Sequence, residues 1–169
     1  FCYNTIMAKL YYSNKDLEKD LSEITRQISV SGWKPDVVIG PGRGAFVMGV
    51  MLSHYFEVPF HGFEWQTRDH EMIKESTRLE TILSKYSMQN ILLVDDINDS
   101  GSTLLGMSGV VNEWDSTENN NNFMLHESLK YATLFDKESS NFPNVEFTAN
   151  RVKPDEEKWI VFPYEEWWK

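Results

Sequence analysis

The sequence predicts an α/β protein in which a parallel, twisted sheet is flanked by helices. Two runs of apolar residues, 37–39 and 91–94, are continuous rather than alternating, which is typical of strands covered on both faces. Each run is followed by a glycine-containing turn and then by a segment whose apolar residues have helical spacing. Strand, turn and helix repeated in this order favour a parallel sheet with helices on both sides.

The first helix is expected over residues 13–31. Ser13 and Asp16 have the spacing of a capping box at its start, and Gly32 is a natural stop at its end. Its apolar residues fall on one face at helical spacing, namely Leu17, Leu21, Ile24 and Ile28. This pattern predicts an amphipathic helix that packs against the core.

The remaining elements follow from the same reasoning. Helices are expected through residues 46–55 and 102–114, and further strands at 58–64 and 131–135. The polar stretch 66–78 is a candidate mobile loop, and the Asn-rich stretch 113–122 is expected to be a solvated loop or insertion.

Length and composition limit the class of protein. A chain of 169 residues fits one domain, expected over residues 1–169. The net charge of −10 argues against a nucleic-acid binder, and no apolar run approaches the ~20 residues needed to span a bilayer. No secretory signal is evident in residues 1–12, and the single cysteine, Cys2, fits a reducing compartment. We therefore expect a cytoplasmic protein that binds neither nucleic acid nor membranes.

The segment 91–103 carries the clearest chemical signal. An apolar strand ends at Asp95 and Asp96, at the edge where parallel sheets bind ligands. A short turn then leads into a helix, so that backbone N–H groups and hydroxyls of residues 100–103 can surround one phosphate. Carboxylates on one side and a phosphate cradle on the other indicate a site for a ribose phosphate. The structural alternative is a strand end followed by a helix cap.

This segment resembles the ribose-phosphate-binding signature of type I phosphoribosyltransferases. That signature runs as four apolar residues, two acids, two further residues, Asp, Thr or Ser, Gly, any residue and Thr, and the sequence matches it throughout. The resemblance implies that Asp95 and Asp96 hold the ribose hydroxyls and Mg²⁺, and that Asp99 is the general base. It implies a 5′-phosphate site formed by Asn98, Ser100, Gly101, Ser102 and Thr103.

A second turn, Gly42-Arg43-Gly44-Ala45, resembles the turn that receives the pyrophosphate in this family. The resemblance implies that Gly42, Arg43 and Gly44 bind pyrophosphate, and Arg43 offers a fork of donors to its oxygens. It also implies a cis peptide at Gly42–Arg43. The same segment formally fits a dinucleotide fingerprint with Glu64 as its acid, although a single match of this kind is weak. A plain glycine turn with a solvated Arg43 is the other alternative.

Two C-terminal segments resemble those that bind the base in the 6-oxopurine enzymes of the family. The stretch 132–137 resembles a strand ending in a lysine that contacts the 6-oxo oxygen, and 159–165 resembles their hood. The resemblance implies that Lys137 meets O6, Trp159 stacks on the purine and Ile160 lines the pocket, while Glu165 lies near the metal. It also implies a core over about 11–137 and a small hood over about 145–169. The alternatives are a solvated surface lysine, and a Trp159 and Ile160 that cover the core edge.

The function implied is transfer of ribose 5-phosphate from phosphoribosyl pyrophosphate to hypoxanthine, guanine or xanthine, with Mg²⁺ as cofactor and pyrophosphate released. The segment 66–78 is expected to act as a lid that excludes water, and the family resemblance suggests a homodimer or larger oligomer. Two alternatives stay open: a regulatory protein that binds phosphoribosyl pyrophosphate without transfer, and a transferase for adenine or a pyrimidine.

Overall fold

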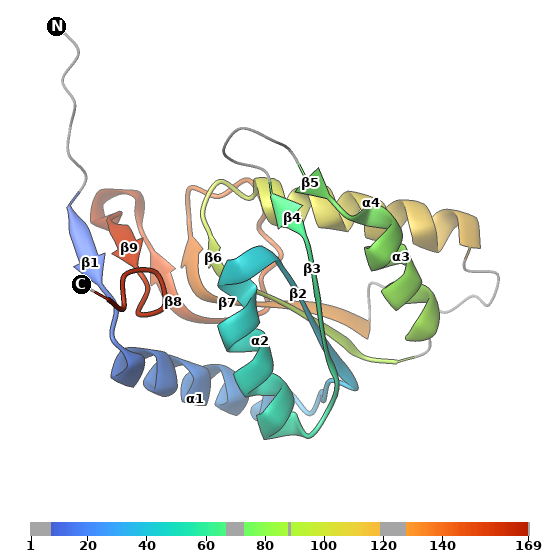
Figure 1. Cartoon of the computed structure of the whole chain (residues 1–169), viewed down its shortest axis with the longest axis horizontal. Coiled ribbons are helices and arrows are strands. Elements are labelled where there is room, and N and C mark those ends of the chain that lie inside the picture. Colours follow the sequence, from blue (N-terminus) through green and yellow to red (C-terminus); the bar gives the residue numbers. More distant parts are fainter. Residues whose placement is uncertain (1–7, 67–72, 88, 119–127, 169) are drawn as a thin grey trace, which may run out of the picture.

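A five-stranded parallel sheet forms the centre of the protein, in the order β3-β2-β6-β7-β8 (Figure 1). The computed structural model describes residues 8–66, 73–87, 89–118 and 128–168. The strands of this sheet are β2 (Val37–Pro41), β3 (Phe60–Phe63), β6 (Ile91–Asn98), β7 (Leu129–Lys137) and β8 (Phe147–Val152). The predicted α/β class with a parallel sheet is confirmed.

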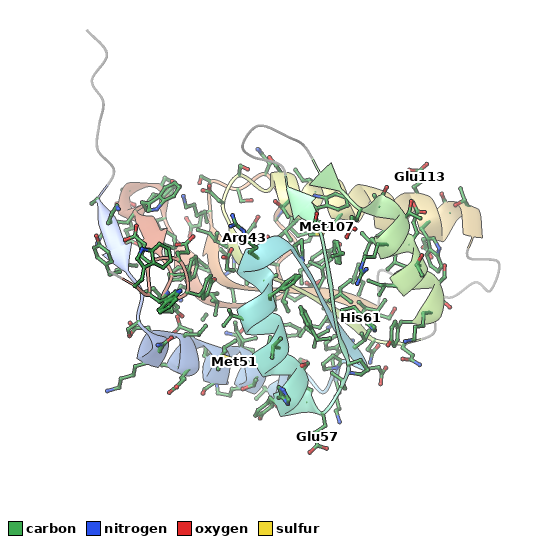
Figure 2. All side chains as sticks on the ribbon, in the orientation of Figure 1. Arg43, Met51, Glu57, His61, Met107 and Glu113 are labelled. Carbon is green, nitrogen blue, oxygen red and sulfur yellow. The ribbon has the colours of Figure 1, made fainter. Side chains whose placement is uncertain are left out.

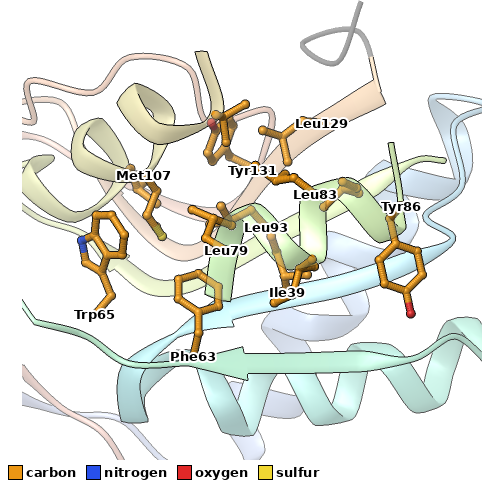
Figure 3. Packing of buried hydrophobic residues seen from close by; sticks show 14 of the residues in the cluster. Ile39, Phe63, Trp65, Leu79, Leu83, Tyr86, Leu93, Met107, Leu129 and Tyr131 are labelled. Atoms are coloured by element: carbon orange, nitrogen blue, oxygen red, sulfur yellow. The ribbon is translucent and has the colours of Figure 1, made fainter. Parts of the chain in front are cut away.

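Helices cover both faces of this sheet, which explains the continuous apolar runs. The four helices of the described chain are α1 (Asn14–Val30), α2 (Gly42–Phe56), α3 (Ser76–Lys85) and α4 (Ser102–Glu118). Along β6, Ile91 and Leu93 enter the cluster that contains the buried residues of α3 and α4. Leu92 and Val94 enter the cluster formed with α1 and α2. Figure 3 shows the first cluster, with Leu93 beside Leu79 and Leu83 of α3.

The predicted N-terminus of α1 is confirmed. The Ser13 hydroxyl accepts a hydrogen bond from the backbone N–H of Asp16, and the Asp16 carboxylate accepts one from the backbone N–H of Ser13. These two bonds satisfy donors that a helix start otherwise leaves without partners.

A buried polar group joins α1 to the far edge of the sheet. The Tyr12 hydroxyl and the Asn150 amide each donate to Asp20 Oδ2, both at 2.6 Å. The Asn150 amide also donates to the carbonyl of Leu134 at 3.0 Å. Because Tyr12 precedes α1 and Asn150 lies on β8, these bonds connect three separate segments of the chain.

The stretch 66–78 differs from the predicted loop. Strand β4 (Trp65–Gln66) pairs antiparallel with β5 (Ile73–Lys74), and α3 begins at Ser76. Residues 67–72, which include part of the expected lid, lie outside the described residues. Helix α4 extends to Glu118, so the first part of the predicted loop 113–122 is helical, and 119–122 also lie outside. The buried residues Leu79, Ile82 and Leu83 explain why α3 forms: its apolar face is needed to cover the sheet.

The C-terminal stretch is divided between two sheets. Strand β8 belongs to the main sheet, so the sheet extends beyond residue 137 into the stretch assigned to the hood. A short 3₁₀ helix η1 (Pro154–Glu156) follows, and then β9 (Trp159–Val161) pairs in parallel with β1 (Lys9–Tyr11). The described helices include none that is long and apolar enough to cross a bilayer.

Candidate functional site

A cleft of about 810 Å³ opens at the C-terminal ends of β2 and β6. Two strand-to-helix turns and the C-terminal segment form its walls. The residues predicted for the site that line it are Gly42, Arg43, Gly44, Asp95, Asp96, Asn98, Asp99, Ser100, Gly101, Ser102, Thr103 and Glu165. Folding therefore brings the two sequence segments, about fifty residues apart, to one place.

The turn between β6 and α4 is built as an anion cradle. Gly101 has φ of +83°, a conformation that favours glycine. A Cβ on Gly101 would lie 2.6 Å from the backbone nitrogen of Phe142, so this position also requires glycine sterically. The Ser100 and Ser102 hydroxyls lie 2.9 Å apart at the first turn of α4. Hydroxyls and backbone N–H groups at a helix N-terminus suit a phosphate.

Asn98 has a structural role in this turn. Its amide nitrogen donates to Asp136 Oδ1 and to the Phe142 carbonyl, both at 2.8 Å, and its oxygen accepts from the Ser140 hydroxyl at 2.7 Å. The side chain is buried and its hydrogen-bonding groups are used within the protein. The Asn98 side chain therefore holds the turn between β6 and α4 in place.

The first glycine turn lies opposite, at the N-terminus of α2. Gly42 has φ of +56° and is the first residue of the helix, and Arg43 lies at this end of α2 (Figure 2). The expected cis peptide at Gly42–Arg43 is wrong, because the described residues contain no cis peptide bond. The left-handed conformation of Gly42 turns the chain instead. Arg43 is exposed and lines the cleft, where its guanidinium is available to an anion.

Asp96 is the more constrained of the paired acids. The Tyr164 hydroxyl donates to Asp96 Oδ2 at 3.0 Å, and the Tyr164 ring stacks on Phe162 with 5.3 Å between centroids. Burial, together with the charge of Glu165, raises the pKa of Asp96 to about 6, against the opposing effect of the Tyr164 hydrogen bond. A Cβ on Gly44 would lie 2.6 Å from Asp96 Cγ, so the glycine makes room for this carboxylate.

The three expected metal ligands do not form one cluster. Among the described residues, no group of three or more His, Cys, Asp or Glu side chains is arranged to hold a metal ion. Glu165 is exposed, and its Oε2 accepts the backbone N–H of Phe162 at 2.9 Å. Asp95 and Asp96 remain adjacent in the cleft. Two carboxylates fit Mg²⁺, which is commonly held by one or two of them together with substrate phosphates and water.

Lys137 is buried rather than solvated. Its side chain is 7% exposed, and its Nζ lies 2.5 Å from Asp99 Oδ1 and 3.2 Å from Glu157 Oε2. Burial lowers the pKa of Lys137, but the two carboxylates outweigh burial and raise it above the usual value. The alternative of a surface lysine is therefore wrong. Glu157 lies outside every motif identified in the sequence. Its negative charge, opposite to that of Lys137, was the only feature of the sequence that could have indicated this contact.

The three residues expected at the base, Lys137, Trp159 and Ile160, lie outside the cleft lining, and Lys137 reaches it through its contact with Asp99. Trp159 is 55% exposed on β9, where it pairs with Lys9, and Ile160 packs against the cluster under α1 and α2. The aromatic residues that line the cleft are Trp65, Tyr164 and Trp168. The sequence showed an aromatic-rich tail but not which of its rings reach the cleft.

The fold and the cleft define an α/β protein with paired acids and a glycine-containing turn at the carboxyl edge of a parallel sheet. Residues 7–167 match the model of the phosphoribosyl transferase domain family, and the chain belongs to this family. Its similarity to the type I enzymes, predicted from the segment 91–103, is confirmed.

Solved structures with the same fold have low sequence identity to the chain. A purine phosphoribosyltransferase from Pyrococcus horikoshii is 23% identical, with a TM-score of 0.67 and 95% of each chain covered. The xanthine-guanine-hypoxanthine phosphoribosyltransferase of Helicobacter pylori is 21% identical, with a TM-score of 0.64 over 95% of this chain and 94% of that chain. A protein from Neisseria gonorrhoeae with bound ppGpp is 19% identical, with a TM-score of 0.67 over 96% and 92%. Comparison with curated proteins found no match.

Proposed function

We propose that the protein transfers ribose 5-phosphate from phosphoribosyl pyrophosphate to a 6-oxopurine (hypoxanthine, guanine or xanthine) and releases pyrophosphate. The observation that carries this proposal is the contact between Asp99, in the phosphate turn, and the buried ammonium of Lys137. An acid and a cation held together at the end of the sheet suit N7 and O6 of a 6-oxopurine, which lie on the same side of the base. The similar structure from Helicobacter pylori bears the name of an enzyme for these three bases.

Different residues of the cleft would bind different parts of the donor, phosphoribosyl pyrophosphate. Residues 100–103 would bind the 5′-phosphate through N–H and hydroxyl groups, and Arg43 would donate to the pyrophosphate from the opposite wall. Asp95 and Asp96 would accept hydrogen bonds from the ribose hydroxyls and favour the positive charge that develops on the sugar ring. Mg²⁺ bound beside Asp95 and Asp96 would supply charge neutralisation for the pyrophosphate.

Asp99 and Lys137 would act on the base. Lys137 would donate to the 6-oxo oxygen, and Asp99 would accept or guide the purine proton. Holding donor and acceptor in one cleft would supply much of the rate through proximity.

The proposal is tested by supplying phosphoribosyl pyrophosphate and Mg²⁺ with hypoxanthine, guanine, xanthine, adenine or a pyrimidine, and quantifying nucleotide and pyrophosphate. Nucleotide from the 6-oxopurines alone supports the proposal. Product from adenine or a pyrimidine alone would mean that this base, and not a 6-oxopurine, is the acceptor. Mg²⁺-dependent donor binding without product from any base indicates a regulatory protein. Asp99→Asn should reduce turnover strongly and spare donor binding, whereas Asp155→Asn, on the exposed helix η1, is the matched control.

We also propose that the protein forms a homodimer or a larger homo-oligomer. Helix α2 exposes four large apolar side chains, at 40%, 43%, 38% and 60%: Phe46, Val50, Met51 and Tyr55. A cluster of this kind on one helix suits an interface between subunits. Light scattering on the purified protein would give the mass directly, and a monomer at high concentration would contradict this proposal.

A further inference from the structure

Glu157 contacts the base-binding lysine from a part of the chain that no motif includes. It lies between helix η1 and strand β9, and its Oε2 is 3.2 Å from Lys137 Nζ. Its side chain is 22% exposed, so the contact is substantially shielded from water. Because it is shielded, this pair differs from the exposed ion pairs of a protein surface, whose contribution to stability is small.

Both oxygens of Glu157 are engaged. Oε1 accepts the Ser139 hydroxyl at 2.5 Å while Oε2 receives the Lys137 ammonium. Ser139 lies in the turn that follows β7, two residues after Lys137. The carboxylate is therefore fixed at two points, and it fixes in turn the position of the ammonium group.

This arrangement leaves the lysine with a defined direction for a ligand. An ammonium group has three N–H donors, and two carboxylates, Asp99 and Glu157, contact the ammonium of Lys137. With two donors directed to these acids, one N–H of the ammonium is left for a further acceptor. Without Glu157, the Lys137 side chain would be held by Asp99 on one side only, and its Nζ could turn away from the position that an incoming base requires.

We propose that Glu157, supported by Ser139, is a positioning residue that directs Lys137 toward the base and thereby sets the preference for purines with an oxygen at C6. The carboxylate of Glu157 fixes only the ammonium of Lys137. It should therefore affect only the binding of a base that offers this ammonium an acceptor atom. Under the proposed function, phosphoribosyl pyrophosphate would be bound by residues 100–103 and Arg43, which do not contact Glu157, so its binding should be independent of Glu157. The inference rests on the proposed function, because it takes Lys137 as the group that meets the 6-oxo oxygen.

The test compares Glu157→Gln with Glu156→Gln, a change of the same kind at the neighbouring exposed residue in η1. KM and kcat are measured for hypoxanthine, guanine, adenine and phosphoribosyl pyrophosphate. In Glu157→Gln, KM for the 6-oxopurines should rise about tenfold, because the charged partner that fixes the Lys137 ammonium becomes a neutral amide. kcat and KM for the donor should change little, and the ratio of activity with hypoxanthine to that with adenine should fall. Glu156→Gln should match the parent protein.

Ser139→Ala provides a milder variant that keeps both charges. It should raise KM for the 6-oxopurines by about threefold, since it removes one of the two contacts that fix Glu157 and keeps its ion pair with Lys137. This variant and a thermal melting curve for each protein separate positioning from loss of fold.

Each outcome bears on a different claim. If the parent protein makes no nucleotide from any 6-oxopurine, the proposed function fails, and the inference fails with it. If the parent protein is active and Glu157→Gln has the same KM and base preference as Glu156→Gln, only the inference is overturned. A loss shared equally by every substrate, with a lowered melting temperature, also overturns it, because Glu157 would then be purely structural.

Discussion

Replacing Gly44 by alanine tests whether the position of the Asp96 carboxylate controls activity. Gly44 lies in the first turn of α2, directly against this carboxylate. A Cβ there would stand 2.6 Å from Asp96 Cγ and 2.9 Å from Asp96 Oδ1, with Oδ2 closer still. Carbon atoms in contact are normally 3.5–4.0 Å apart, so the carboxylate must move by about 1 Å to make room.

The expected effect on stability is small. Alanine is favoured over glycine in a helix by about 0.5–1 kcal/mol. This gain is opposed by the weakening of the hydrogen bond from the Tyr164 hydroxyl to Asp96, which is 3.0 Å long. The net contribution of such a hydrogen bond to stability is about 1 kcal/mol. The two effects nearly cancel, so Gly44→Ala should fold with a free energy of unfolding within about 1 kcal/mol of the parent.

The expected effect on catalysis is large. A displacement of about 1 Å at a reacting centre can lower the rate about a hundredfold, so kcat/KM for phosphoribosyl pyrophosphate should fall by about that factor. Steady-state kinetics would measure this fall, and urea denaturation would measure stability. Gly109→Ala is the matched control, because Gly109 also lies in a helix, α4, and a Cβ there meets nothing within 4 Å. It should gain up to about 1 kcal/mol and leave kcat/KM unchanged.

An unchanged kcat/KM in Gly44→Ala, with stability also unchanged, would refute the reasoning. It would mean that the position of Asp96 does not limit the reaction. A fall of several kcal/mol in the free energy of unfolding would refute it in another way, because the loss of activity would then follow from loss of fold.

Three further predictions concern the turn between β6 and α4, the buried polar group at Asp20, and His61 on β3. Gly101→Ala should destabilise the fold by about 2 kcal/mol or more, since it strains a left-handed backbone, and should abolish binding of a nucleoside 5′-monophosphate measured by calorimetry. Asp20→Ala should lower the free energy of unfolding by about 3 kcal/mol in urea denaturation, because the buried donors of Tyr12 and Asn150 lose their acceptor. His61 should titrate below pH 6.5 by NMR, because burial and the nearby charges of α3 lower its pKa. The folded protein then binds this proton more weakly than the unfolded chain, so stability should fall as the pH drops from 6.5 through the folded pKa.

Each of these three has a result that would contradict it. Tight nucleotide binding by Gly101→Ala would show that this turn is not part of the phosphate site. Parent-like stability of Asp20→Ala would mean that water replaces the lost acceptor. A His61 pKa at or above 6.5 would contradict the prediction, because stability would then not fall through His61 as the pH drops below 6.5.

Local patterns in the sequence were sufficient for the class of fold and for the two turns of the cleft. Continuous apolar runs at 37–39 and 91–94, each followed by a glycine-containing turn, favour strands covered on both faces. The capping box at Ser13 and the glycines of the turns act within a few residues of themselves, so they too could be predicted. Helix α3 could not, because its short apolar face is weak by itself and forms by packing on the sheet.

The sequence by itself indicated the strands of the sheet, the paired acids at the end of one of them and the turn into the following helix, because each of these patterns lies within a few neighbouring residues. Only the tertiary structure decided which distant side chains meet. It brought Lys137 from β7 and Glu157 from the C-terminal segment together, and it bonded the Asn98 side chain to Asp136 and to the 140–142 turn. It also placed Tyr164 on Asp96 and left Trp159 outside the cleft lining. The physical reason is that burial and charge pairing between segments far apart in sequence depend on the folded geometry, which no local pattern encodes.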